Sequence, residues 1–185
     1  MVHPWKLREA ARHFRSGGLL AYPTEAVYGL GCDPLNADAV LGILRLKQRP
    51  IDKGLILVAA DYAQLRPFIT PLDDEAMQRV FASWPGPTTW LLPAAPDLPY
   101  WLSGKHATLA VRVSDHPLTA ALCRACNSPL VSTSANPAGL PPARNALTVR
   151  RMFDDRLDYL LVGDTGRRLT PSRIIDAASG RIIRA

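Results

Sequence analysis

Apolar residues recur along the chain at two spacings, which predict alternating helices and strands. Positions three and four apart, as in Val40, Ile43 and Leu44, are typical of amphipathic helices, whereas short apolar runs such as 54–59 indicate buried strands. The helical spacing predicts helices over residues 5–15, 36–49, 72–84, 116–126 and 145–153. The apolar runs predict strands over residues 19–22, 54–59, 88–92, 109–113, 130–132, 159–162, 174–176 and 182–183.

Glycine and proline separate these elements. Gly17 and Gly18 follow the first predicted helix, and Pro50 ends the second. We expect Trp5 and Phe14, together with Ala11, among the buried residues of the first helix.

The order of the elements predicts the fold class. Strands that alternate with helices indicate an α/β domain, classed as α+β in some schemes. The link between strands 88–92 and 109–113 leaves room for antiparallel neighbours, so we expect a mixed parallel and antiparallel sheet. No segment looks like a linker, and we expect a single domain over residues 1–185.

The composition excludes several classes of protein. Hydrophobic residues make up 48% and charged residues 21%, as in a globular chain. No run of 18 apolar residues exists, and the first ten residues lack a signal-peptide pattern. We therefore expect no membrane span and a cytoplasmic protein, in which the three cysteines form no disulfide framework.

The charge balance points to an anionic partner. The chain holds 22 Lys plus Arg against 16 Asp plus Glu, and 18 of the 22 cations are arginine. The planar fork of arginine suits phosphate and carboxylate groups. Nucleotide and nucleic acid both fit this pattern.

Several familiar catalytic patterns have little support. Cys123 and Cys126 form a CxxC without a second ligand pair, and the carboxylates are scattered, so we expect no protein metal site. Neither a GxxxxGK[ST] loop nor a serine elbow is present, so a nucleotide must be held in another way.

Four polar segments follow or adjoin predicted strands. They are residues 22–31 (YPTEAVYGLG), 46–54 (LKQRPIDKG), 132–139 (STSANPAG) and 170–176 (TPSRIID). Each has an ordinary structural explanation, since such residues also form turns and helix ends. Together, at strand ends in an arginine-rich chain, they predict one anion-binding cleft.

Five segments resemble, in order and spacing, the motif set of the YrdC/TsaC family, the bacterial threonylcarbamoyl-AMP synthases. They are YPTEAVYGLG, LKQRPIDKGL, LAVRVSDHP, STSANPAGLP and PSRIIDA. The resemblance covers essentially the whole chain. It implies a three-layer fold of helices around a twisted mixed sheet with a basic concave face.

The resemblance also implies an activity. Family members make L-threonylcarbamoyl-adenylate and pyrophosphate from ATP, L-threonine and bicarbonate, and Mg²⁺ is expected to arrive with the triphosphate. Downstream threonylcarbamoyl-transferase proteins then modify the adenosine after the anticodon in tRNAs that read codons beginning with A. No protein nucleophile is required.

The resemblance assigns roles to individual residues. The family's KxR…SxN catalytic constellation falls on Lys47, Arg49, Ser134 and Asn136. Contacts with ATP are expected from Arg49, Lys53, Thr108, Asn136, Arg144 and Arg184. Contacts with threonine are expected from Thr24, Arg112, Ser134 and Ser172, with Arg112 on the carboxylate. Ala26 stands where long-form relatives carry a threonine, and Arg173 stands where they carry a hydroxyl residue.

Two other functions remain open from the residues. An RNA-binding module without turnover could hold tRNA or double-stranded RNA by phosphate contacts alone. A compact set of hydroxyl groups beside the cations favours a small-molecule cleft instead. The second is carbamoyl transfer in a different maturation system, because the same domain occurs fused in hydrogenase-maturation proteins. The absence of zinc-finger-like and acylphosphatase-like segments argues against this function.

Overall fold

The computed structural model describes residues 3–166, 168, 170 and 172–185. Its helices are α1 (Pro4–Arg15), α2 (Ala37–Lys47), α3 (Asp74–Ala82), α4 (Tyr100–Ser103), α5 (Pro117–Cys126) and α6 (Ala146–Phe153). Its strands are β1 (Leu20–Pro23), β2 (Tyr28–Gly31), β3 (Ile56–Ala59), β4 (Thr88–Pro93), β5 (Thr108–Val113), β6 (Leu130–Ser134), β7 (Tyr159–Leu160), β8 (Arg173–Asp176) and β9 (Ile182–Arg184).

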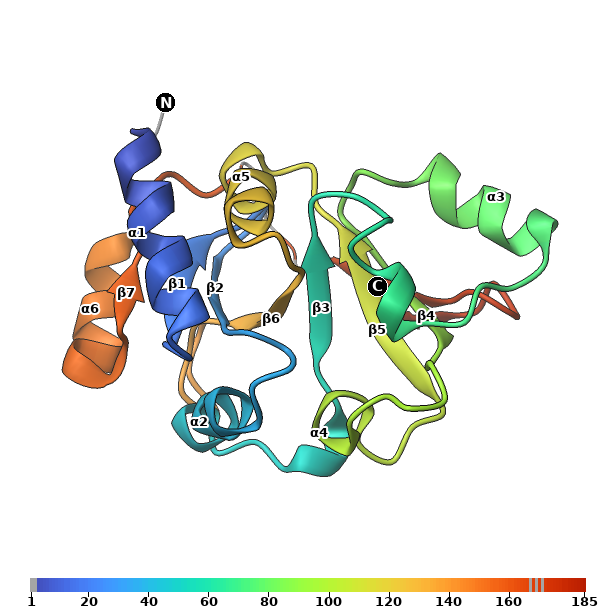
Figure 1. Ribbon diagram of the computed structural model, residues 1–185, viewed down its shortest axis with the longest axis horizontal. Coiled ribbons are helices and arrows are strands. Elements are labelled where there is room, and N and C mark those ends of the chain that lie inside the picture. Colours follow the sequence, from blue (N-terminus) through green and yellow to red (C-terminus); the bar gives the residue numbers. More distant parts are fainter. Residues whose placement is uncertain (1–2, 167, 169, 171) are drawn as a thin grey trace.

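The strands form one mixed sheet, which confirms the predicted class (Figure 1). Their order in the sheet is β7-β1-β2-β6-β3-β5-β4-β8-β9. The pairs β1–β7, β3–β5 and β4–β8 are parallel, and the remaining five pairs are antiparallel. The predicted neighbours 88–92 and 109–113 pair antiparallel as β4 and β5.

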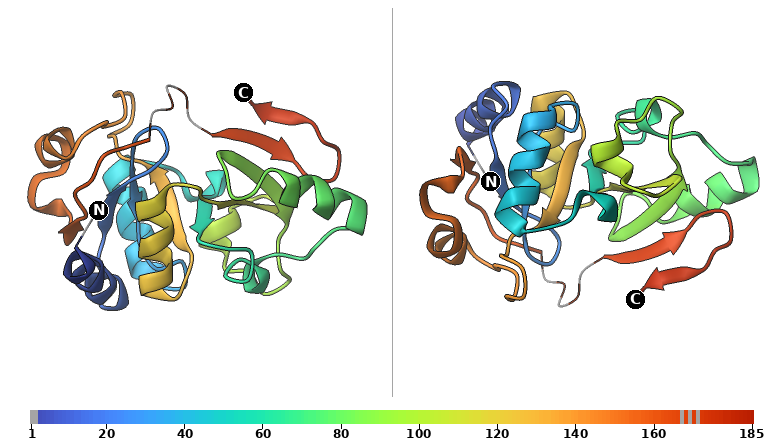
Figure 2. Two further views of the ribbon diagram at one scale, coloured as in Figure 1. Left: turned by 90° about the horizontal axis from the view of Figure 1, so that it is seen from above. Right: turned by 90° about the horizontal axis from the view of Figure 1, so that it is seen from below.

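Alternation along the strands divides the core between the two faces of the sheet. On β3, Leu57 and Ala59 pack in a cluster with α2, whereas Val58 packs on the opposite face with α1 and α5. Figure 2 shows α5 in front when the molecule is seen from above and α2 in front when it is seen from below. The fold therefore has three layers, with the sheet between two layers of helices.

Side-chain caps explain where the predicted helices begin. At the start of α2, the Asn36 carboxamide oxygen accepts the Ala39 N–H at 3.0 Å. At the start of α3, the Asp73 carboxylate accepts the Ala76 N–H at 2.8 Å. His116 is the N-cap of α5, at the first residue of the predicted helix 116–126. None of the helices in the described ranges is long and apolar enough to cross a membrane.

One buried-residue prediction is wrong. Trp5 is 52% exposed, whereas Phe14 and Ala11 are buried. Trp5 and Phe14 are nine positions apart, which places the two side chains on opposite sides of α1 because each residue turns the helix by about 100°. The face with Phe14 packs against the sheet and α5.

Candidate active site

A cavity of about 580 Å³ lies on the face of the sheet that carries α1 and α5, beyond the part that these helices cover. Ile56 of β3 lines this cavity, and two residues further along the same strand Val58 packs in the α1–α5 cluster. The pleat sends both side chains to one face. The cavity is therefore a region of the sheet face that polar side chains occupy in place of a helix.

The register of β5 brings Arg112 into this cavity. Leu109, Val111 and Val113 belong to the core on the other face, so Thr108 and Arg112 point the opposite way and line the cavity. The β6 residues Ser132, Thr133 and Ser134 add hydroxyl groups beside them. The sheet thus supplies a floor that carries one buried cation and a row of hydroxyls.

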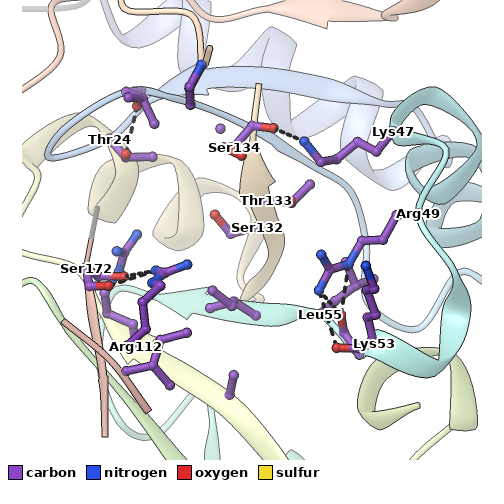
Figure 3. A pocket seen from close by; sticks show the side chains of 18 of the residues that line it. Thr24, Lys47, Arg49, Lys53, Leu55, Arg112, Ser132, Thr133, Ser134 and Ser172 are labelled. Atoms are coloured by element: carbon purple, nitrogen blue, oxygen red, sulfur yellow. Dashed lines mark hydrogen bonds between the residues drawn. The ribbon is translucent and has the colours of Figure 1, made fainter. Parts of the chain in front are cut away.

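The end of α2 supplies the other cations. Gln48 adopts a left-handed conformation at φ 49°, and the Arg49 N–H reaches back to the Leu44 carbonyl at 3.0 Å, the pattern of a Schellman cap. Pro50 then prevents the helix from continuing. The turn directs Arg49 and Lys53 to the cavity wall opposite Arg112 and Ser172 (Figure 3).

Lys47 ties the end of α2 to the end of β6. Its Nζ donates to the Ser134 carbonyl at 2.6 Å, the Asn136 carbonyl at 2.8 Å and Asn136 Oδ1 at 3.0 Å. Ser134 Oγ donates to the same Oδ1 at 2.7 Å. Burial of the ammonium, with the positive charge of Arg49 nearby, lowers the pKa of Lys47 to about 8. At neutral pH the charged lysine fixes the 134–136 segment.

The Arg49 guanidinium is also anchored from behind. Its Nε and Nη2 donate to the Gly54 carbonyl at 3.2 and 2.9 Å, and Nη2 also reaches the Lys53 carbonyl at 3.3 Å. These bonds hold the fork in one orientation at the cavity wall, which favours binding of a phosphate with little loss of entropy.

Arg112 pairs with a carboxylate from another element. Its Nη2 lies 3.3 Å from Glu25 Oε2, and the two side chains are only 9% and 7% exposed. Ser114 Oγ donates to the other oxygen, Glu25 Oε1, at 2.6 Å. Although burial raises the pKa of Glu25, Arg112 and Ser114 outweigh it, so the pKa lies below its ordinary value and the carboxylate is charged.

The C-terminal hairpin closes the same end of the cavity. Arg184 Nη2 donates to the Ser172 carbonyl at 2.7 Å, and the Ser172 hydroxyl lies 3.0 Å from the Thr89 hydroxyl. Arg184 lines the cavity, and burial followed by the positive charge of Arg112 lowers its pKa. Two guanidinium groups therefore lie close to Ser172.

A segment after β7 lies across the β1–β2 turn at the rim of the cavity. The Gly166 N–H donates to the Thr24 carbonyl at 2.9 Å, and the Arg168 N–H donates to the Glu25 carbonyl at 3.2 Å. A Cβ at Gly166 would lie 2.3 Å from the Glu25 carbonyl oxygen. Only glycine permits this approach, so the segment holds the turn that carries Glu25.

The structure brings together ten of the eleven residues that the motifs predict. Arg144 is exposed and is not among the described residues that line the cavity, so its contact with a nucleotide stays a prediction. Pro171, part of the fourth motif, lies outside the described residues. The residues that line the cavity as predicted are Thr24, Lys47, Arg49, Lys53, Thr108, Arg112, Ser134, Asn136, Ser172 and Arg184.

Sequence reasoning assigned no role to several other lining residues. Glu25 stands next to Thr24 in the first motif, but its partner Arg112 lies on a distant strand. Ser132 and Thr133 belong to the third motif, and His106 enters from the loop before β5. A hydroxyl or carboxylate inside a recognised motif was the signal available for the first three, whereas nothing in the sequence singles out His106.

Comparison with known proteins identifies the family. The family model for Sua5, YciO and YrdC proteins, described as "Telomere recombination", matches residues 12–185. The chain belongs to this family. A Nitrosococcus oceani relative is 54% identical over 180 residues, 97% of each chain, and a Cellvibrio japonicus relative is 52% identical over 97% of this chain and 95% of its own. Both are named threonylcarbamoyl-AMP synthase.

A solved structure of the family has the same fold. The chain superposes on P. abyssi Sua5 complexed with L-threonine with a TM-score of 0.91 and 34% identity, covering 98% of this chain and 54% of that one. The sequence-based assignment to the family is thereby confirmed.

Proposed function

We propose that this chain is a threonylcarbamoyl-AMP synthase, which makes L-threonylcarbamoyl-adenylate and pyrophosphate from L-threonine, bicarbonate and ATP. The observation that carries the proposal is the charge pattern of the cavity, with Arg112 at one end, Arg49 and Lys53 at the other, and hydroxyl groups between them (Figure 3). The end with Arg112 suits a carboxylate, and the end with Arg49 and Lys53 suits a triphosphate. The naming of relatives about half identical over nearly the full length supports the same activity.

Arg112 holds the threonine carboxylate, and Ser172 and Ser134 orient the rest of the amino acid. The threonine amine and bicarbonate give a carbamate and water. The carbamate oxygen then attacks the α-phosphorus of ATP, and the bond from that phosphorus to the bridging oxygen breaks to release pyrophosphate. Because both reactants are anionic, Arg49 and Lys53 lower the barrier by neutralising charge on the phosphates.

Magnesium enters as part of the MgATP substrate. The described residues contain no group of three His, Cys, Asp or Glu side chains that could hold a metal ion. Asn136 Oδ1 already accepts hydrogen bonds from Lys47 and Ser134, so we expect phosphate oxygens and water to supply most ligands of the ion. The protein's own cations bind and align the phosphates.

We expect the wider setting that the family resemblance implies. The adenylate passes to threonylcarbamoyl-transferase proteins, with tRNA as the final acceptor and the cytoplasm as the compartment. The excess of cationic residues supports binding of RNA, since the chain has 22 Lys plus Arg and only 16 Asp plus Glu.

The test is pyrophosphate release from MgATP, with threonine and bicarbonate added singly and together. We expect release only with both, because the carbamate is the nucleophile. Release from ATP alone, or with serine as efficiently as with threonine, would contradict the assignment. Mass spectrometry of the quenched reaction identifies the adenylate.

Replacement of Arg49 by alanine is expected to lower kcat/KM for ATP at least tenfold, or about 1.4 kcal/mol of transition-state stabilisation. The loss follows from the position of its anchored guanidinium at the phosphate end. Arg45→Ala is the matched control, since Arg45 is exposed on the last turn of α2 and does not line the cavity among the described residues. Equal kcat/KM values for the two variants would contradict the proposed contact of Arg49 with the ATP phosphates.

A further inference from the structure

The Glu25 carboxylate has an unusual environment for a residue at an anion-binding cavity. It lines the cavity and is 6% exposed. A negative charge there opposes the binding of anions, and its burial carries a desolvation cost. Its presence therefore requires an explanation beyond the capture of substrate anions.

The contacts of Glu25 show what it does to Arg112. Within the part of the chain that the structure describes, Glu25 is the only group that pairs with the Arg112 guanidinium. Among the described residues, the buried atoms Arg112 Nε and Glu25 Oε2 have no hydrogen-bond partner. Arg49 differs, because carbonyl oxygens hold its guanidinium. Among the residues that the structure describes, one ion pair thus orients Arg112, and other N–H donors of its guanidinium are left for a ligand.

A chain of contacts holds the carboxylate itself. Ser114 Oγ donates to Glu25 Oε1 at 2.6 Å and accepts the His116 N–H at 3.2 Å. The segment with Gly166 fixes the backbone on the other side. Glu25 is therefore fixed relative to β5, the strand that carries Arg112.

The same pair also sets the charge of this end of the cavity. Arg112 and Arg184 line the same cavity, with Arg184 bonded to Ser172, and two guanidinium charges there would attract a dianion more strongly than a monocarboxylate. Glu25 cancels one of these charges. The phosphate end, with Lys47, Arg49 and Lys53, has no such acidic partner among its described hydrogen bonds and ion pairs.

We propose that Glu25 is a positioning and specificity-determining residue: it holds the Arg112 guanidinium in place and keeps the amino-acid end of the cavity selective for a monocarboxylate over a phosphate. The inference rests on the proposed function, since it takes threonine as the ligand of Arg112. It adds a role for a residue that touches Arg112 and not the reacting atoms.

The test is Glu25→Gln, which keeps the shape and removes the charge. We expect KM for threonine to rise by about tenfold while kcat changes by less than about threefold, because an interaction made equally in ground and transition states is lost. Inorganic phosphate is the probe of charge. It is expected to compete only with ATP in the unaltered protein, and with both ATP and threonine in the variant.

Both changes are required, and a folded Glu25→Gln protein that lacks either one overturns the proposal. Glu75→Gln is the matched control, because Glu75 pairs with Arg79 on the exposed surface of α3. If thermal melting shows that Glu25→Gln does not fold, Ser114→Ala is the second variant. It removes the 2.6 Å bond to Glu25 and the 3.2 Å bond from the His116 N–H, and is expected to raise KM for threonine about threefold. An unchanged KM in that variant also overturns the proposal. Absence of turnover in the unaltered protein would instead refute the proposed function.

Discussion

Replacement of Lys47 by methionine is expected to lower kcat/KM by about a hundredfold to a thousandfold, the range seen when a fixed electrostatic donor is removed from an active site. Methionine fills the space of the apolar stem but cannot donate a hydrogen bond. Three oxygens of Ser134 and Asn136 then lose their shared donor. The segment that carries both side chains is no longer tied to α2, so the phosphate end loses a charge and its geometry.

The same change is expected to reduce the free energy of unfolding by about 1–3 kcal/mol, the cost of leaving buried polar groups unpaired. Steady-state kinetics and chemical denaturation measure the two effects separately. Lys6→Met is the control, since Lys6 is exposed on the first turn of α1. A Lys47→Met protein with normal kcat/KM would show that the lysine only stabilises the fold.

Local sequence signals were enough to predict most of the fold. All five predicted helices and all eight predicted strands are present, because periodicity and caps such as Asn36 act within a few residues. The strand β2 was not predicted, since two of its four residues, Gly29 and Gly31, have low strand propensity. It forms because β1 and β6 pair with it on both sides. At Gly31 a Cβ would lie 2.3 Å from the Val131 carbonyl oxygen, so close packing of strands selects glycine there.

Part of the candidate site could also be predicted from local sequence, and part could not. Cations and hydroxyls within a motif, such as Arg49 and Ser134, could be placed in one cleft from the sequence because neighbouring residues in the chain form that part of the cavity. The pairing of Glu25 with Arg112 could not be predicted, because it depends on the placement of the β1–β2 turn beside β5. The short helix α4 was missed because four residues show no periodicity.

Replacement of Arg112 by leucine is expected to lower the free energy of unfolding by roughly 3–5 kcal/mol near neutral pH, because it leaves the Glu25 carboxylate buried without a counter-charge. It is also expected to raise KM for threonine by about a hundredfold, since the charge-assisted contact that we propose between Arg112 and the threonine carboxylate is lost. Denaturant unfolding and threonine titration measure the two effects.

The pH dependence of stability distinguishes the effect of an unpaired Glu25 carboxylate from that of a simple packing defect. In the unaltered protein the pKa of Glu25 is lowered, so its stabilising contribution is present above the unfolded pKa and is lost as pH falls through the folded one. Without Arg112, we expect burial to raise the pKa of Glu25, so that folding takes up a proton at pH values between the unfolded pKa and the raised folded pKa. The stability difference between the two proteins is therefore expected to be larger at about pH 8 than at about pH 5.5.

A double replacement completes the test. Arg112→Leu combined with Glu25→Gln removes both charges and should recover most of the lost stability, because the cost comes from the unpaired carboxylate and not from the absence of the pair. Threonine binding should stay weak, because no guanidinium remains at that position on β5. A stability difference that does not change with pH, or a double variant as unstable as Arg112→Leu alone, would contradict the buried ion pair. Recovery of stability without recovery of binding would separate the two roles of Arg112, as the counter-charge of Glu25 and as the ligand of the substrate carboxylate.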